Sequence, residues 1–108
     1  MNNLFDLPAQ GSATEIVESL VKGNHVLVER IISIGHTTPA GEWYDQPHDE
    51  WVVLLQGEAQ LEDETGKAIA LYAGDYCLIL AHQKHRVAYT STEPPCIWLA
   101  IHGALSIA

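Results

Sequence analysis

The stretch GEWYDQPHDEWVVLLQG, residues 41–57, runs from a polar turn directly into an apolar segment. Its second half, WVVLLQ at residues 51–56, is typical of a buried β-strand because it is rich in β-branched and aliphatic residues. Successive side chains of a strand point to opposite faces, so Glu50, Val52 and Leu54 share one face. We therefore expect a carboxylate to enter the protein interior beside apolar side chains.

Other polar groups could reach the same interior. Tyr44 and Gln46 have the parity of Glu50, and they face the same side if the chain stays extended through the intervening turn. A second polar cluster, AHQKHRV at residues 81–87, supplies His85 at the start of another expected strand. If these two strands are neighbours, Glu50 and His85 can meet in one cavity.

The rest of the chain is predicted to form short strands separated by Gly and Pro. The expected strands cover residues 25–34, 51–56, 58–62, 67–72, 76–80, 85–90 and 97–102. Short strands at regular spacing, with turn residues between them, are typical of an all-β sandwich or barrel.

The N-terminal region has a different pattern, and we expect a short helix over residues 12–22. Ser12 followed by Glu15 matches a capping box, and Gly23 suits a C-terminal stop. Apolar residues at helical spacing would form one stripe on this helix: Ile16, Val17, Leu20 and Val21. The helix would cover part of the barrel.

Composition limits the protein class. The chain has 108 residues, so we expect one domain with a helical lead at 1–24 and a barrel at 25–108. Apolar residues make up 47% of the chain, which favours a globular fold. The formal net charge of -9 disfavours nucleic acid and anionic membranes as partners. The N-terminus has neither the basic start nor the apolar run of a secretory signal, so we expect a cytoplasmic protein.

Two expected strands, WVVLLQ and IWLAI, are apolar on both faces. One face must line the barrel interior, and the other needs cover from the N-terminal helix or from a second subunit. We therefore expect a homodimer. Cys77 and Cys96 both lie in apolar segments, so we expect buried thiols without a disulfide.

The spacing of several residues resembles the cupin family. Glu50 followed by six residues and then Gly57 is similar to the end of the first cupin motif. Gly74 and Asp75, with His85 eleven residues after the Gly, resemble the second motif. The resemblance covers roughly residues 35–102 and implies a jelly-roll β-barrel with a metal site.

The chain departs from the cupin pattern at the metal site. The two histidines of the first motif are replaced by Tyr44 and Gln46. The resemblance then implies a divalent metal, Fe, Mn, Ni or Zn, held by Gln46, Glu50 and His85. Tyr44, His82 and Trp98 are the residues we expect to contact a cofactor or small molecule. His102 fits a satisfied core histidine better than a ligand, and Asp45 fits either an outward turn or a supporting carboxylate.

The leading hypothesis is a protein that binds a divalent metal and a small molecule in the barrel cavity. Metal-dependent oxygenase, isomerase or lyase chemistry would fit, but no residue identifies a reaction. Two alternatives remain open. One is a metal-free module that binds or senses a small molecule, and the other is an interaction protein that uses its apolar outer faces.

Overall fold

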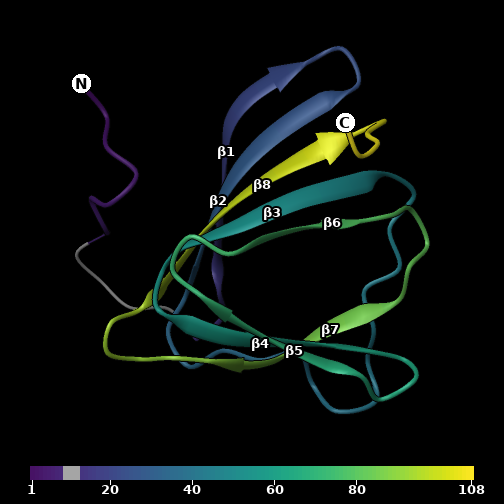
Figure 1. Ribbon diagram of the computed structural model, residues 1–108. Helices are drawn as coiled ribbons and strands as arrows, with labels where there is room; N and C mark the ends of the chain where they lie inside the picture. Colours follow the sequence, from purple (N-terminus) through teal and green to yellow (C-terminus); the bar gives the residue numbers. More distant parts are fainter. Residues whose placement is uncertain (9–12) are drawn as a thin grey trace.

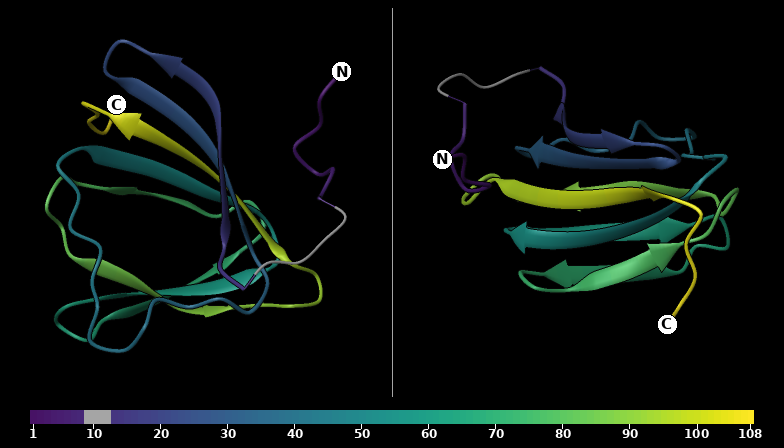
Figure 2. Two further views of the ribbon diagram at one scale, coloured as in Figure 1. Left: turned by 180° about the vertical axis from the view of Figure 1, so that it is seen from behind. Right: turned by 90° about the horizontal axis from the view of Figure 1, so that it is seen from above.

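Two antiparallel β-sheets face each other in the protein (Figures 1 and 2). The structure is a computed structural model that describes residues 1–8 and 13–108. Its strands are β1 (Ile16–Gly23), β2 (Val26–Ser33), β3 (Asp49–Gln56), β4 (Glu58–Asp63), β5 (Ala68–Tyr72), β6 (Tyr76–Ile79), β7 (His85–Thr90) and β8 (Cys96–Gly103). One sheet has the order β1-β2-β8-β3-β6, and the other has the order β5-β4-β7. The all-β jelly-roll prediction is confirmed, as are the expected strands from residue 25 onward.

The hydrophobic core lies between the two sheets and follows from strand alternation. Val52 and Leu54 of β3 point into it, as the period of two predicts, and they are 4% and 0% exposed. Trp98 and Ala100 of β8 join them because β3 pairs with β8 in a register that places Leu54 opposite Trp98. The opposing sheet contributes Leu61. Both sheets therefore bury one apolar face against the other.

The expected N-terminal helix is wrong. Residues 16–23 form β1, which pairs antiparallel with β2, and no helix occurs in residues 1–8 or 13–108. The proposed cap residue Ser12 lies outside the described residues. A short apolar run with β-branched residues fits either period, and the open edge of β2 supplies backbone partners that only a strand can use. None of the described residues belongs to a helix long and apolar enough to span a membrane.

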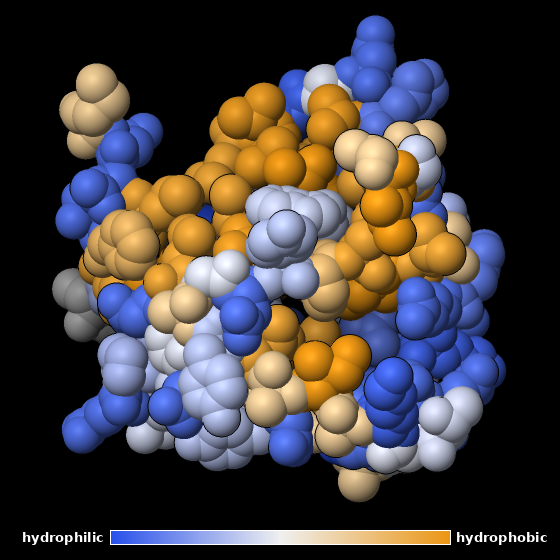
Figure 3. Space-filling view, in the orientation of Figure 1, coloured by the Kyte–Doolittle hydropathy of each residue, from blue (hydrophilic) through white to orange (hydrophobic). Residues whose placement is uncertain are grey.

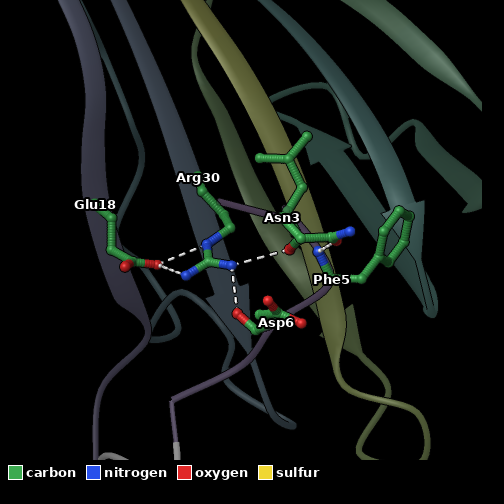
Figure 4. A network of polar contacts seen from close by, with 6 residues as sticks. Asn3, Phe5, Asp6, Glu18 and Arg30 are labelled. Atoms are coloured by element: carbon green, nitrogen blue, oxygen red, sulfur yellow. Dashed lines mark hydrogen bonds and ion pairs between the residues drawn. The ribbon is translucent and has the colours of Figure 1, made fainter. Parts of the chain in front are cut away.

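The N-terminal segment lies on the outer face of the larger sheet (Figure 4). Arg30 of β2 donates to the backbone oxygens of Leu4 and Asp6 at 2.9 and 2.6 Å, and it also pairs with Glu18 of β1. Arg30 shares its face with Ile32, which is 1% exposed. Part of the outer apolar face is thus covered by the chain's own N-terminus.

Candidate small-molecule site

A cavity of about 150 Å³ opens between the two sheets, and we call it the inner cavity. Side chains from both sheets and from the loop before β3 line it. These residues are Glu15, Val17, Glu29, Ile31, Tyr44, Gln46, Glu50, Val52, Leu61, Ile79, His85, Val87, Trp98 and His102. Of the six predicted site residues, five therefore share this one space.

Glu50 is the most buried acidic side chain of the inner cavity. It begins the apolar part of β3, lies opposite His102 of β8, and is only 7% exposed. Within the described residues, its side-chain carboxylate makes no hydrogen bond or ion pair. Burial raises the pKa of the Glu50 carboxyl, and nearby Glu29 and Glu15 raise it further, whereas His102 and His85 oppose the rise. Glu50 is thus a buried acid without a direct partner.

His85 and Tyr44 form one wall of the inner cavity. Their backbones exchange two hydrogen bonds, from Tyr44 N to His85 O at 2.8 Å and from His85 N to Tyr44 O at 3.2 Å. The two rings stack with centroids 5.4 Å apart. His85 Nδ1 lies 3.0 Å from the backbone oxygen of Gln83, a contact in which Nδ1 donates because the carbonyl oxygen can only accept. This geometry brings together a loop residue and a strand residue that the sequence places far apart.

Tyr44 is held by a carboxylate that the sequence analysis did not assign to the site. Its hydroxyl donates to Glu15 Oε1 at 3.2 Å. Burial, followed by the charge of Glu15 and this hydrogen bond, raises the pKa of Tyr44 to about 12. The phenol therefore stays protonated at neutral pH and serves as a donor on the cavity wall.

Gln46 and Trp98 also line the inner cavity, and His82 does not. Trp98 is 4% exposed in the core. The His82 side chain is 70% exposed and lies 2.8 Å from Asp45, so these two groups form a pair outside the cavity. Because His82 adopts a positive φ of 61°, the loop turns there. Only the backbone nitrogen of His82 contacts a site residue, donating to Gln46 O at 2.7 Å.

Three polar lining residues escaped the sequence analysis as members of the site: Glu15, Glu29 and His102. Glu29 Oε1 lies 2.7 Å from His102 Nε2, and both side chains are 16% exposed. The imidazole is satisfied, as expected, but it faces the cavity. A signal was present in β2, where Glu29 interrupts an apolar strand at the parity of Ile31. Glu15 was hidden because it was assigned to a helix cap.

A second, larger cavity of about 370 Å³ adjoins the first, and we call it the outer cavity. Its lining residues are Lys22, Gly23, His25, Val26, Leu27, Glu29, Gln46, Pro47, His48, His102 and Gly103. Because Glu29, Gln46 and His102 line both cavities, they form the boundary between them. The outer cavity has one lysine, whereas no described residue of the inner cavity is Lys or Arg.

The donor set fits a metal ion poorly. Within the described residues, no group of three or more His, Cys, Asp or Glu side chains is placed to hold one ion. Glu50 and His85 line the inner cavity with Gln46, which offers only an amide oxygen as a third donor. His102 Nε2 is already in contact with the Glu29 carboxylate. Divalent transition metals bind best to several imidazole and carboxylate groups, and the set of Gln46, Glu50 and His85 supplies one of each.

Comparison with known proteins agrees with this architecture. Residues 31–102 match the family described as Cupin domain. A crystal structure from Ralstonia eutropha, described as a "putative mannose-6-phosphate isomerase", is 40% identical, with a TM-score of 0.90 over 97% of this chain and 98% of that one. A cupin superfamily protein from Desulfitobacterium hafniense is 18% identical, with a TM-score of 0.74 over 92% and 84%. No curated protein matches the chain. The family match spans well over half of the sequence, and the chain is therefore a member of the cupin family.

Proposed function

We propose that this cupin binds a small molecule in the inner cavity directly through its own side chains. The observation that carries the proposal is Glu50, a 7% exposed carboxylate on the cavity wall without a direct partner among the described residues. Burying such a group is unfavourable unless something pairs with it, so its retention in a cavity favours a ligand. Apolar walls with a few converging polar groups are the usual features of a small-molecule site.

The description of the Ralstonia relative does not transfer readily to the inner cavity. A sugar phosphate carries a dianion that proteins hold with Arg, Lys or backbone N–H groups. The described lining residues include three carboxylates, Glu15, Glu29 and Glu50, and no Lys or Arg. A phosphate group would meet repulsion there, and Lys22 lines only the outer cavity.

A divalent metal, Fe, Mn, Ni or Zn, is the second candidate. It is favoured by the presence of Gln46, Glu50 and His85 in the lining of one cavity, the three residues that the motif comparison singles out. Such an ion would act as a Lewis acid on a bound molecule. Without it, the His85 imidazole and the Glu50 carboxyl can each exchange a proton with a bound molecule, because both face the cavity.

Elemental analysis of protein purified without a His tag separates the two candidates. Direct binding predicts a metal content far below one ion per chain, together with ligand-induced chemical shifts at Trp98 and His102. The metal candidate instead predicts about one ion per chain, which is lost in both Glu50→Gln and His85→Gln. Protein that shows neither metal nor any ligand response at the cavity residues would refute the proposal.

We also propose that the chain forms a homodimer through the outer face of the larger sheet. Apolar side chains gather over much of the upper half of Figure 3. Val21 of β1 and Val26 of β2 are 59% and 38% exposed, and Trp51 on the outer face of β3 is half-buried. The N-terminal segment covers this face only near Arg30. A second copy would bury the remaining apolar surface.

A further inference from the structure

We propose that the inner cavity selects a positively charged small molecule, namely a primary amine on a compact apolar body. This inference rests on the proposed direct binding and names its ligand class. Three independent features support it: the charge of the lining, the unpaired Glu50 carboxylate and the size of the inner cavity.

The lining of the inner cavity is rich in negatively charged side chains. Glu15, Glu29 and Glu50 reach the inner cavity from three different strands or their flanks, and no described lining residue is Lys or Arg. Among the lining residues that the structure describes, only His85 and His102 could offset this charge. A cavity lined by one sign of charge within apolar walls attracts the opposite sign.

The three carboxylates differ in whether they have a direct partner. Glu29 is engaged by His102 at 2.7 Å, and Glu15 accepts from Tyr44 at 3.2 Å. Glu50 is more than nine-tenths buried and has no such contact among the described residues. An ammonium group carries three N–H donors and would give Glu50 a charge-assisted hydrogen bond. A neutral hydroxyl would give a weaker bond, and an anion would be repelled.

The size and the apolar walls of the inner cavity suit a compact ligand. A volume of about 150 Å³ suits a body no larger than a single ring, since a protein cavity of about that size holds benzene. Val17, Ile31 and Leu61 supply apolar walls for such a body. Trp98 presents an aromatic ring in the same space, and aromatic faces attract cations. A bare divalent cation would not use these walls, and no group of three His, Cys, Asp or Glu side chains among the described residues is placed to hold one.

The test compares benzylamine, benzyl alcohol and benzoate, which share a ring and differ in charge. Binding to the full chain is followed by NMR through the Trp98 indole N–H and the His102 ring signals, with Trp98→Phe used for assignment. We expect saturable shifts with benzylamine, with an affinity about tenfold or more above that of benzyl alcohol. Benzoate should leave the Trp98 signal unchanged; if it binds near Lys22, only outer-cavity signals should move.

Two variants then identify the side chain that recognises the ammonium group. Glu50→Gln keeps the shape of the side chain and should remove most of the preference for the amine, while Glu64→Gln at the exposed β4–β5 turn should leave it intact. Equal or tighter binding of benzyl alcohol or benzoate at Trp98 would overturn the charge preference and leave direct binding standing. If none of the three probes moves any cavity signal, both this inference and the proposed direct binding fail.

Discussion

Glu50 of β3 and His102 of β8 lie directly opposite each other on neighbouring antiparallel strands, and both side chains line the inner cavity. His102 is in turn engaged by Glu29 of β2. Glu29 lies opposite Ala100 of β8, two residues away from His102, so three adjacent strands bring two carboxylates and an imidazole together on one face of the sheet. Only one of the two carboxylates has a direct partner, and this asymmetry leads to the first two predictions.

Glu50→Gln should stabilise the fold at high pH. Folding raises the pKa of Glu50 above its ordinary value of 4.5, mainly through burial, so ionised Glu50 opposes folding. This penalty is absent below the ordinary pKa, grows as pH rises towards the raised pKa, and is complete above it. We expect the free energy of unfolding to rise by about 1–3 kcal/mol in the variant at about pH 8.

Urea denaturation at about pH 4 and about pH 8 measures this effect. The gain should shrink or disappear at the lower pH, where Glu50 is protonated in both states. Glu64→Gln, at an exposed turn, serves as the matched control and should change little at either pH. A variant that is less stable than the parent at about pH 8 would contradict the assignment of Glu50 as an unpaired buried acid.

The Glu29–His102 pair should show energetic coupling. Both side chains are 16% exposed, so solvent screens the 2.7 Å contact only partly. A double-mutant cycle with Glu29→Gln and His102→Gln should give a coupling free energy of about 1–2 kcal/mol. Thermal or urea unfolding of the four proteins supplies the values. Additive single effects would show that the pair is not a structural unit.

Arg30→Ala should release the N-terminal segment. Arg30 is 8% exposed. Its guanidinium donates to the Glu18 carboxylate and to the backbone oxygens of Leu4 and Asp6. Its loss should lower the free energy of unfolding by about 2–4 kcal/mol, because the Glu18 carboxylate and two backbone oxygens lose this donor. Hydrogen exchange should accelerate most at residues 3–6, whereas exchange within β3 and β8 should change only by the loss of global stability. Unchanged exchange at the N-terminus would rule out this clamp.

Gly57→Ala should be much more damaging than Gly66→Ala. Both glycines have positive φ, 93° and 90°, so each substitution carries a similar backbone strain of about 1–2 kcal/mol. A Cβ at Gly57 would lie 2.8 Å from both Cys96 Sγ and Ser91 Oγ, whereas a Cβ at Gly66 meets nothing within 4 Å. We expect an additional loss of about 1–3 kcal/mol at Gly57 in urea denaturation. Equal effects would mean that the close approach is relieved easily.

Trp51→Ala tests the proposed homodimer. Its ring is on the outer face and lies 5.5 Å from the Tyr76 ring, centroid to centroid, on the neighbouring strand β6. Removing a large aromatic group from a dimer interface typically weakens association at least tenfold. Sedimentation velocity over a range of concentrations should show a shift towards monomer. A parent protein that is monomeric at all concentrations would refute the dimer, whatever the variant does.

The local pattern of the sequence was sufficient for most of the fold. Apolar runs bounded by Gly and Pro identify the strands from residue 25 onward, because burial of one or both faces imposes that pattern directly. Alternation also placed Glu50 in the interior beside Val52 and Leu54. The same reasoning failed at residues 16–23. The pattern of this short apolar segment fits both a helix and a strand, and pairing with β2 decides between them.

The sequence by itself determined which side chains share a face within each strand, and hence that Glu50 and His85 enter the interior of the barrel. Only the tertiary structure decided which faces meet. The cluster of Glu29, His102 and Glu50 requires β8 to lie between β2 and β3, a pairing that joins segments distant along the chain. Likewise, the turn at His82 directs its side chain to Asp45 and away from the cavity. Spacing along the chain reports local periodicity, whereas the contacts between strands depend on the free energy of the whole packed sheet.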